Sequence, residues 1–327
     1  MTDIAMITAA AARLKGHARL TPLLSSPFLD DIAGRHVLVK PECLQHTGSF
    51  KYRGAWSAVS ALPPDVRANG VIAFSSGNHA QGVALAARQH GVPAVIVMPG
   101  DAPRLKIDNT RALGAEVVLY DRNTEDRAAI GTRLSRERGL TLIKPFDEPQ
   151  VIAGQGTVGL EIAQQAADRG IDKADVIVNC GGGGLTSGIA LALEALAPGL
   201  RARPAEPAEF DDTARSLRSG RIEKNAPGAH SICDAIVTPS PGRITFPIMK
   251  RLCGPGLTVS DDECLHAMAL AFLRLKIVLE PGGAVSLAAA LFHKERIEGE
   301  TVICVATGGN VDADMFCRAL ETFGGPQ

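Results

Sequence analysis

The chain has 327 residues and a net charge of −1, with 34 Lys and Arg against 35 Asp and Glu, a length that suits one large core or two domains. This near-neutral balance gives no electrostatic case for binding nucleic acid or an anionic membrane surface. No apolar run approaches the about 20 residues of a membrane span, and the N-terminus lacks the pattern of a signal peptide.

The first informative segment is Gly-Ser-Phe-Lys-Tyr-Arg-Gly at residues 48–54. It places Lys51 after a small, flexible pair and an aromatic side chain. A lysine acts as an amine nucleophile only where its surroundings favour the neutral amine and fix its direction. Most lysines are solvated surface residues. This one gains meaning from two later segments that suit a phosphate-bearing aldehyde cofactor.

The second segment lies between a predicted strand at 71–74 and a predicted alanine-rich helix at 83–88. Residues 75–82 read Ser-Ser-Gly-Asn-His-Ala-Gln-Gly. Two hydroxyls, a glycine and an amide on one turn can hold a carboxylate and a phenolic oxygen. Ordinary helix capping is the alternative interpretation of the serines and the asparagine. A structural role is the alternative for His79.

Strand-like and helix-like segments alternate along the rest of the chain. Short apolar runs at 92–98, 116–120 and 301–306 predict strands, and alanine- and arginine-rich stretches at 128–138 and 159–169 predict helices. This alternation indicates an α/β fold with parallel sheets covered on both faces.

The cysteines indicate the redox compartment. There are seven, with no Cys-x-x-Cys pair. Cys180 and Cys304 lie inside apolar runs, where free cysteine behaves as a small core residue. An odd count with core placement favours free thiols in a reducing cytoplasm.

The third segment is a run of four glycines at 181–184, between the apolar run 176–180 and a helix predicted to begin near Leu185. Consecutive backbone N–H groups of such a turn can converge on one anion at the positive end of a helix dipole. The run is not a Walker loop, since no Gly-Lys-Ser/Thr follows. It also lacks the spacing of a dinucleotide-binding loop. A strand-to-helix turn without a ligand is the alternative.

Together these segments resemble the fold-type II pyridoxal-phosphate enzymes, specifically the serine/threonine dehydratase and serine racemase family. The resemblance covers nearly the whole chain and implies two doubly wound α/β domains with mainly parallel sheets and an active-site cleft between them. Residues 1–56 and 148–327 would form the large cofactor-binding domain, and residues 57–147 the small inserted domain. The motifs that carry the resemblance, in the family's order and spacing, are residues 48–55, 75–79, 153–157, 181–184, 280–281 and 307–310.

The resemblance implies roles around the cofactor, pyridoxal 5'-phosphate. Lys51 would hold it as a Schiff base, release it to the substrate amine and then remove the α-proton. Phe50 would pack against the ring, and Asn78 would hydrogen-bond its 3-oxygen. The phosphate would be bound by consecutive backbone N–H groups, those of Gly181, Gly182, Gly183, Gly184 and Leu185.

Thr307 matches the position where the family places a hydroxyl or thiol facing the pyridine nitrogen. A neutral hydroxyl, unlike a carboxylate, does not hold that nitrogen protonated. The cofactor is then a weaker electron sink, which favours expulsion of a β-substituent. A strand-end cap is the alternative interpretation of this residue.

The resemblance also implies the substrate-binding residues. Ser76 matches a serine that faces the α-carbon from the side opposite the lysine. In a racemase it exchanges a proton there; in a dehydratase it helps to bind the carboxylate or handles a proton, so it does not separate the two activities. Arg127 aligns with a position that can reach the substrate, with a solvated helix-surface arginine as the alternative. The full predicted set is Ser75, Ser76, Asn78, His79 and Arg127.

Residues 206–212, Glu-Pro-Ala-Glu-Phe-Asp-Asp, resemble the family's divalent-cation site. The implied ligands for Mg²⁺ or Ca²⁺ are Glu206, the carbonyl of Phe210, and Asp212, all hard oxygen donors. Pro204 cannot donate to a sheet ladder, which weakens the strand expected before this loop. A solvated acidic loop capping a helix at 213–217 is the alternative.

The predicted function is a pyridoxal-phosphate-dependent dehydratase (ammonia-lyase) that converts a β-hydroxy-α-amino acid to a 2-oxo acid and ammonia. L-Threonine and L-serine are the default substrates. A 3-hydroxyaspartate dehydratase and a serine racemase are alternatives on the same scaffold, and a β-replacement synthase fits the motifs less well. The alternative from a different class of protein is a catalytically inactive binding protein with the same fold. Such a protein would not need an intact Lys51. The expected partners are a small amino-acid substrate and a second copy of the chain in a cytoplasmic homodimer, without nucleic acid or membrane.

Overall fold

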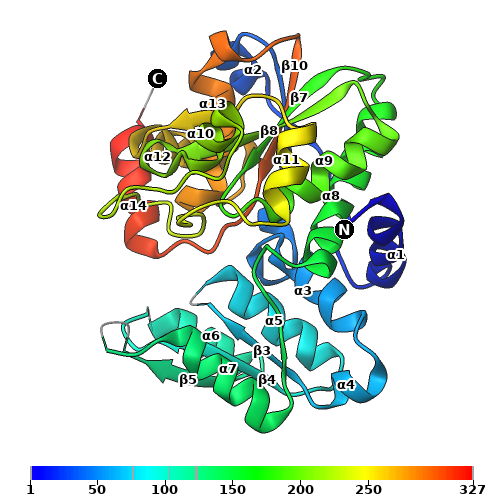
Figure 1. The fold of residues 1–327 in the computed structure, drawn as a ribbon. Coiled ribbons are helices and arrows are strands. Elements are labelled where there is room, and N and C mark those ends of the chain that lie inside the picture. Colours follow the sequence, from blue (N-terminus) through cyan, green and yellow to red (C-terminus); the bar gives the residue numbers. More distant parts are fainter. Residues whose placement is uncertain (1, 76, 103, 122–123, 326–327) are drawn as a thin grey trace.

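The larger of two sheets is six-stranded. The computed structural model describes residues 2–75, 77–102, 104–121 and 124–325. The strand order is β1-β2-β10-β7-β8-β9, and only the β1–β2 pair is antiparallel. Figure 1 shows this sheet in the upper body of the molecule. Its strands are β1 (Leu24–Ser25), β2 (His36–Pro41), β7 (Ala174–Asn179), β8 (Leu200–Pro207), β9 (Leu257–Val259) and β10 (Thr301–Ala306).

A second, four-stranded sheet forms the lower body in Figure 1, with the order β5-β4-β3-β6 and parallel pairing throughout. All its strands come from one continuous part of the chain, which lies inside the predicted inserted domain. The bounds of that domain, 57 and 147, stay a prediction. The strands are β3 (Val71–Phe74), β4 (Ala94–Pro99), β5 (Glu116–Tyr120) and β6 (Thr141–Leu142).

Helices cover both sheets. Around the four-stranded sheet lie α4 (Pro64–Ala68), α5 (Asn78–Gln89), α6 (Arg104–Ala112) and α7 (Arg127–Arg138). The other described α-helices are α1 (Ile4–Leu14), α2 (Pro27–Ala33), α3 (Lys51–Ser60), α8 (Pro149–Ala167), α9 (Gly184–Leu196), α10 (Asp212–Ser219), α11 (Thr245–Leu252), α12 (Asp261–Leu270), α13 (Pro281–Phe292) and α14 (Ala313–Phe323). Short 3₁₀ turns at Glu42–Leu44, His46–Gly48, Ala208–Phe210 and Lys294–Arg296, and a π-turn at Ala271–Leu275, complete the helical segments.

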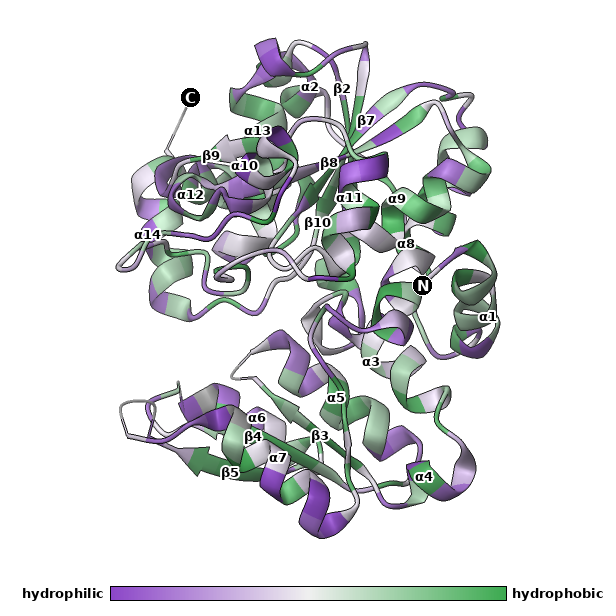
Figure 2. Cartoon of the chain, in the orientation of Figure 1, coloured by the Kyte–Doolittle hydropathy of each residue, from purple (hydrophilic) through white to green (hydrophobic). Residues whose placement is uncertain are grey.

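The central strands of the larger sheet are apolar because both of their faces are covered. β7 is buried along its whole length, as expected for a strand inside a parallel sheet. Ile177 packs into the cluster that includes Val285 of α13, whereas Val176 packs into the cluster that includes Ile189 of α9. Figure 2 shows hydrophobic residues gathered along the strands of both sheets. The α/β fold with two mainly parallel sheets is therefore confirmed.

Pro204 does not interrupt the strand before the acidic loop. β8 runs through it and pairs with Val178 of β7 at that position. On its other side β8 meets β9 only over 205–207, so Pro204 lies just before the second ladder begins. Of the helices described, none combines the length and the apolar character needed to cross a membrane.

A buried ion network anchors α3, the helix that begins at Lys51. The Arg53 guanidinium lies 2.7 Å from a Glu42 oxygen and 2.6 Å from a Glu161 oxygen. Lys40 Nζ lies 2.6 Å from the other Glu161 oxygen. Two cations thus face two carboxylates away from water. Removing one partner of such a buried network costs about 3–5 kcal/mol, so the network holds the start of α3 in place.

Candidate active site

A cavity of about 380 Å³ lies at the carboxyl ends of strands β7 and β10, facing the turn between β3 and α5. Ligands of open α/β sheets bind at this end of the strands. Both sheets contribute to its walls. Ser75 and residues 77–79 follow β3, whereas residues 181–186 follow β7.

The cavity gathers nearly all the site residues predicted from the sequence. One of them, Ser76, lies outside the described residues. The predicted cation ligands Glu206, Phe210 and Asp212 do not line it. Those that do are Phe50, Lys51, Ser75, Asn78, His79, Arg127, Gly181, Gly182, Gly183, Gly184, Leu185 and Thr307.

The Lys51 amine has the surroundings that amine chemistry requires. Its Nζ donates a hydrogen bond to the carbonyl of Pro145 at 2.9 Å and lies 5.1 Å from the centre of the Phe50 ring. Burial lowers the pKa of Lys51 to about 8, although the carboxyl of Glu280 opposes the shift. A substantial fraction of this amine is therefore neutral near physiological pH, as a nucleophile needs.

A chain of hydrogen bonds links Asn78 to the larger body. Asn78 Nδ2 donates to Glu280 Oε1 at 2.6 Å, and Asn78 Oδ1 accepts from Asn310 Nδ2 at 2.7 Å. Burial raises the pKa of Glu280 to about 7, while the bond from Asn78 opposes that shift. The Asn78 amide keeps one N–H for a ligand. Glu280 was not predicted as a site residue. Its position directly before a helix-opening proline could have indicated one.

His79 is held as a neutral ring. Its Nε2 lies 2.9 Å from the carbonyl of Ile143, so this nitrogen carries the proton. Burial, assisted by the Lys51 charge, lowers the pKa of His79 to about 3. The ring supports the wall of the cavity and adds no charge to it.

The glycine turn at 181–184 lines the cavity. The Gly182 carbonyl accepts hydrogen bonds from Thr245 Oγ1 at 2.6 Å and from the Gly242 N–H at 3.1 Å. A Cβ on Gly182 would lie 2.3 Å from the Phe146 ring, and Gly183 has φ +88°, so side chains are excluded here. No described side chain caps α9. Free N–H groups at a helix start form an anion site.

Thr307 lies in a polar cluster on the cavity floor. Its hydroxyl oxygen accepts from Asn179 Nδ2 at 2.8 Å, and its carbonyl accepts from the Phe50 N–H at 3.1 Å. Asn179 also donates to the carbonyl of Gly282 and accepts from the N–H of Ser286. Asn179 was not predicted as a site residue, although a single amide within the apolar run 176–180 indicates a buried polar role.

Two cationic side chains complete the wall contributed by the smaller sheet's helices. Lys106 of α6 and Arg127 of α7 both line the cavity. Lys106 Nζ lies 3.0 Å from Asp234 Oδ2, which belongs to the loop on the opposite wall. Burial works against charge on Lys106, but Asp234 outweighs it and raises the pKa of the amine. Lys106 is therefore a permanent cation at the cavity.

The acidic loop forms a separate cluster. Both Glu206 oxygens cap α10, accepting from the N–H groups of Thr213 at 2.9 Å and Ala214 at 2.8 Å. Asp212 Oδ1 accepts from Asn225, whereas its Oδ2 has no hydrogen-bond partner among the described residues. Burial raises the pKa of Glu206 well above its usual range and that of Asp212 to about 6. In the described ranges no three His, Cys, Asp or Glu side chains converge as metal ligands.

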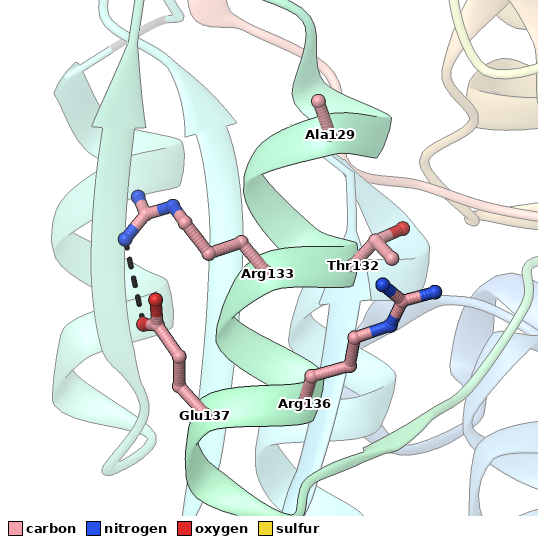
Figure 3. A pocket seen from close by; sticks show the side chains of 5 residues that line it. All are labelled: Ala129, Thr132, Arg133, Arg136 and Glu137. Atoms are coloured by element: carbon pink, nitrogen blue, oxygen red, sulfur yellow. Dashed lines mark hydrogen bonds and ion pairs between the residues drawn. The ribbon is translucent and has the colours of Figure 1, made fainter.

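A second hollow, of about 540 Å³, lies on the outside of α7. Figure 3 shows its lining, in which Arg133 and Glu137 form an ion pair of 3.4 Å. Every lining residue is exposed and belongs to this one helix: Ala129, Thr132, Arg133, Arg136 and Glu137. None is a predicted site residue, and these exposed side chains on one helix surface do not form an enclosed reactive site.

Known proteins similar to this chain support a cofactor site in the cavity. The family model described as pyridoxal-phosphate dependent enzyme matches residues 14–308. The chain belongs to this family. An L-threo-3-hydroxyaspartate ammonia-lyase of Pseudomonas sp. is 45% identical over 95% of this chain and 96% of the relative. A serine racemase of Oryza sativa subsp. indica is 38% identical over 97% of this chain and 94% of the relative.

Among solved structures, a bacterial threonine deaminase (T.th.) superposes with a TM-score of 0.89 at 44% identity, covering 95% of this chain and 99% of that one. The predicted family and fold class are thus confirmed. The relatives also support the predicted enzyme class, a pyridoxal-phosphate-dependent ammonia-lyase.

Proposed function

We propose that this protein is a pyridoxal-phosphate-dependent ammonia-lyase that converts a β-hydroxy-α-amino acid to a 2-oxo acid and ammonia. One observation carries the proposal: a buried amine, a glycine turn with free N–H groups and a buried hydroxyl line the same cavity. These three groups suit the aldehyde, the phosphate and the ring nitrogen of the cofactor. Ammonia-lyases 45% and 44% identical to this chain support the reaction type.

The residues present fit the cofactor. Lys51 would form a Schiff base with its aldehyde, and the N–H groups of 181–185 would bind its phosphate. Asn78 would donate an N–H to the ring oxygen, and the Thr307 hydroxyl would serve the ring nitrogen. When bound, the cofactor accepts the electrons released at the substrate's α-carbon.

The protein's own residues would handle the proton and the carboxylate. Lys51 Nζ, with a pKa of about 8, would take the α-proton once the substrate amine has displaced it. Gly77, the residue before α5, has no side chain to cap the helix, so the first N–H groups of α5 would bind the substrate carboxylate. Ser75 lies on that turn, and Ser76 stays the predicted partner on the face opposite Lys51.

A specific observation favours 3-hydroxyaspartate over L-threonine and L-serine. Lys106, which also pairs with Asp234, and Arg127 add two cations to the cavity wall, where a second carboxylate could form charge-assisted hydrogen bonds. A methyl group or a hydrogen in that place would gain nothing from them. Two relatives named L-threo-3-hydroxyaspartate ammonia-lyase, at 45% and 44% identity, support the same substrate.

One assay tests the function and ranks the substrates. Purified protein loaded with pyridoxal phosphate is incubated with L-threonine, L-serine and the stereoisomers of 3-hydroxyaspartate, and the release of 2-oxo acid and ammonia is measured. Release from at least one of them is expected, with 3-hydroxyaspartate fastest. A loaded protein that releases no 2-oxo acid from any would contradict the proposal.

A structural cation and a dimer are further parts of this proposal. The unpaired Asp212 oxygen, beside a second buried carboxylate, supports a Mg²⁺ or Ca²⁺ site with Glu206 and the Phe210 carbonyl. The exposed rings of Phe28, which lies against Arg274, and of Phe272 support burial against a second copy of the chain. Seven free cysteines fit a reducing cytoplasm. Light scattering tests the dimer.

A further inference from the structure

We propose that Asn179 is a positioning residue that turns the Thr307 hydroxyl proton into the cavity, so that this hydroxyl donates to the cofactor's ring nitrogen and keeps it unprotonated. The inference rests on the proposed function, because it needs the cofactor in this cavity. It concerns a residue of β7 that touches no substrate in the scheme above.

The direction of the Asn179 amide is settled by its two backbone partners. Ser286 N–H can only donate, and it lies 2.6 Å from Asn179 Oδ1. The Gly282 carbonyl can only accept, and it lies 2.7 Å from Asn179 Nδ2. Turning the amide over would place donor against donor and acceptor against acceptor. Both partners belong to the first two turns of α13, four residues apart.

The settled amide fixes the role of Thr307. The second N–H of Asn179 Nδ2 points to Thr307 Oγ1 at 2.8 Å, so this hydroxyl accepts there. A hydroxyl has one proton, and that proton cannot lie on the axis to Nδ2. Asn179 and Thr307 are 4% and 3% exposed, which removes bulk water as a competing partner. Among the described residues the Thr307 hydroxyl has no acceptor for its proton, and Thr307 lines the cavity. The proton is therefore directed at the cavity, where an unprotonated ring nitrogen would accept it.

The consequence concerns which reaction the site favours. A nitrogen that accepts a hydrogen bond from a neutral hydroxyl has its basicity lowered, because protonation would set N–H against O–H. The ring is then a weaker electron sink, and prompt loss of the β-hydroxyl is favoured over return of the α-proton. Asn179 would thus favour elimination by helping to keep the ring nitrogen unprotonated.

The decisive measurement is the protonation state of the ring nitrogen in the resting holoenzyme. The apoprotein is reconstituted with pyridoxal phosphate carrying ¹⁵N in the ring, and the ¹⁵N chemical shift is followed against pH. The wild-type nitrogen is expected to be unprotonated at neutral pH. A protonated nitrogen in the wild type overturns the proposal without any variant.

The Asn179→Asp variant reverses the hydrogen bond. A carboxylate still accepts from the Ser286 N–H but loses the hydrogen bond to the Gly282 carbonyl. It now also accepts the Thr307 proton, so Thr307 Oγ1 turns a lone pair toward the ring. We expect the ring nitrogen's pKa to rise by at least about one unit, a tenfold change in the protonated fraction. An unchanged ¹⁵N titration in a variant that binds the cofactor overturns the proposal. If this variant does not fold, the same titration on Thr307→Val must show a shift from the wild type.

Ser286→Ala is the matched control. It removes a buried hydroxyl that donates to Val305 in the same region but keeps the backbone N–H that Asn179 needs. Its ¹⁵N titration should equal the wild type. During turnover in D₂O, Asn179→Asp should also raise deuterium uptake into recovered substrate relative to ammonia release. The ¹⁵N measurement needs no turnover. A protein without lyase activity would therefore contradict the proposed function, while the ¹⁵N titration would still test the role of Asn179.

Discussion

The cavity and the acidic loop at 206–212 both bury ionisable groups, but they compensate the burial differently. In the cavity, burial lowers the pKa of Lys51 to about 8 and raises that of Glu280 to about 7. Each group becomes easier to neutralise, and opposite charges face each other when both are ionised. In the loop, two carboxylates face each other, and Asp212 adds to the upward shift of the Glu206 pKa. The cavity groups can therefore exchange protons near neutral pH. The two buried carboxylates of the loop instead require a proton or a bound cation to offset their charge.

The largest effect should come from removing the amine of the cavity. Lys51→Ala is expected to abolish turnover, because it removes both the Schiff-base nitrogen and the α-proton base. Borohydride reduction followed by mass spectrometry should place the cofactor on Lys51 in the wild type. Lys173→Ala, which changes an exposed lysine, should behave as wild type. An adduct on another lysine would contradict the assignment.

Ser76→Ala should harm catalysis far more than folding. Loss of a helix-capping serine costs about 1 kcal/mol of stability. Loss of a residue that handles a proton or the substrate carboxylate should lower kcat by roughly 100-fold or more. Activity and the free energy of unfolding are measured on the same preparation. A loss of activity no greater than the loss of folded protein would favour the capping interpretation.

Lys106→Met should separate the substrates. The change removes the cation but keeps much of the apolar stem, and a charged hydrogen bond is worth about 1.5–3 kcal/mol. We expect kcat/KM for 3-hydroxyaspartate to fall about 10- to 100-fold, with L-serine and L-threonine nearly unaffected. Arg104→Met on the same helix, whose side chain is 88% exposed, is the control. Equal losses for all substrates would assign Lys106 to cavity structure alone.

The pH dependence of cofactor uptake reports the cavity amine directly. A lysine with a pKa of about 8 is about one-tenth neutral at pH 7, far more than an ordinary lysine. Because only the neutral amine attacks the aldehyde, the rate of Schiff-base formation in the apoprotein should rise with pH and level off above about 8. A rate that keeps rising tenfold per unit beyond pH 9 would show an unshifted amine.

The smallest effect concerns the loop. The folded pKa of Asp212, about 6, lies above the ordinary value of 3.8, so the folded state binds more protons and stability falls as pH rises through this range. Mg²⁺ or Ca²⁺ should therefore raise Tm by a few degrees at pH 7, and less at pH 5, relative to chelated protein. Asp212→Asn should lose this response. Asp211→Asn, whose partner is Arg215, should keep it.

Local signals explain why much of the site was predictable. A glycine run after an apolar strand, and a lysine between small and aromatic residues, act through backbone geometry and neighbours within a few positions. The strand at 116–120 and the helix near 128–138 were likewise readable from local composition, whereas the helix expected at 159–169 begins earlier, at Pro149, and ends at Ala167. The acidic loop was harder, since the same carboxylate pattern serves a cation or a helix cap, and Glu206 caps α10.

The sequence by itself indicated the fold class and the family, and it predicted Lys51 and the glycine turn as contacts of the cofactor, because each of these motifs consists of residues adjacent in the chain. Only the tertiary structure decided which polar groups tune that site. Asn78 meets Glu280 across 202 positions, and Asn179 meets Thr307 across 128. Lys106 also meets Asp234 across 128 positions. Asn179 and Thr307 meet because β7 and β10 are neighbouring strands of one sheet, whereas the other two pairs join segments from the two bodies of the molecule. The burial of Asn179, Thr307 and Glu280 strengthens their polar interactions, whereas Asp234 is exposed.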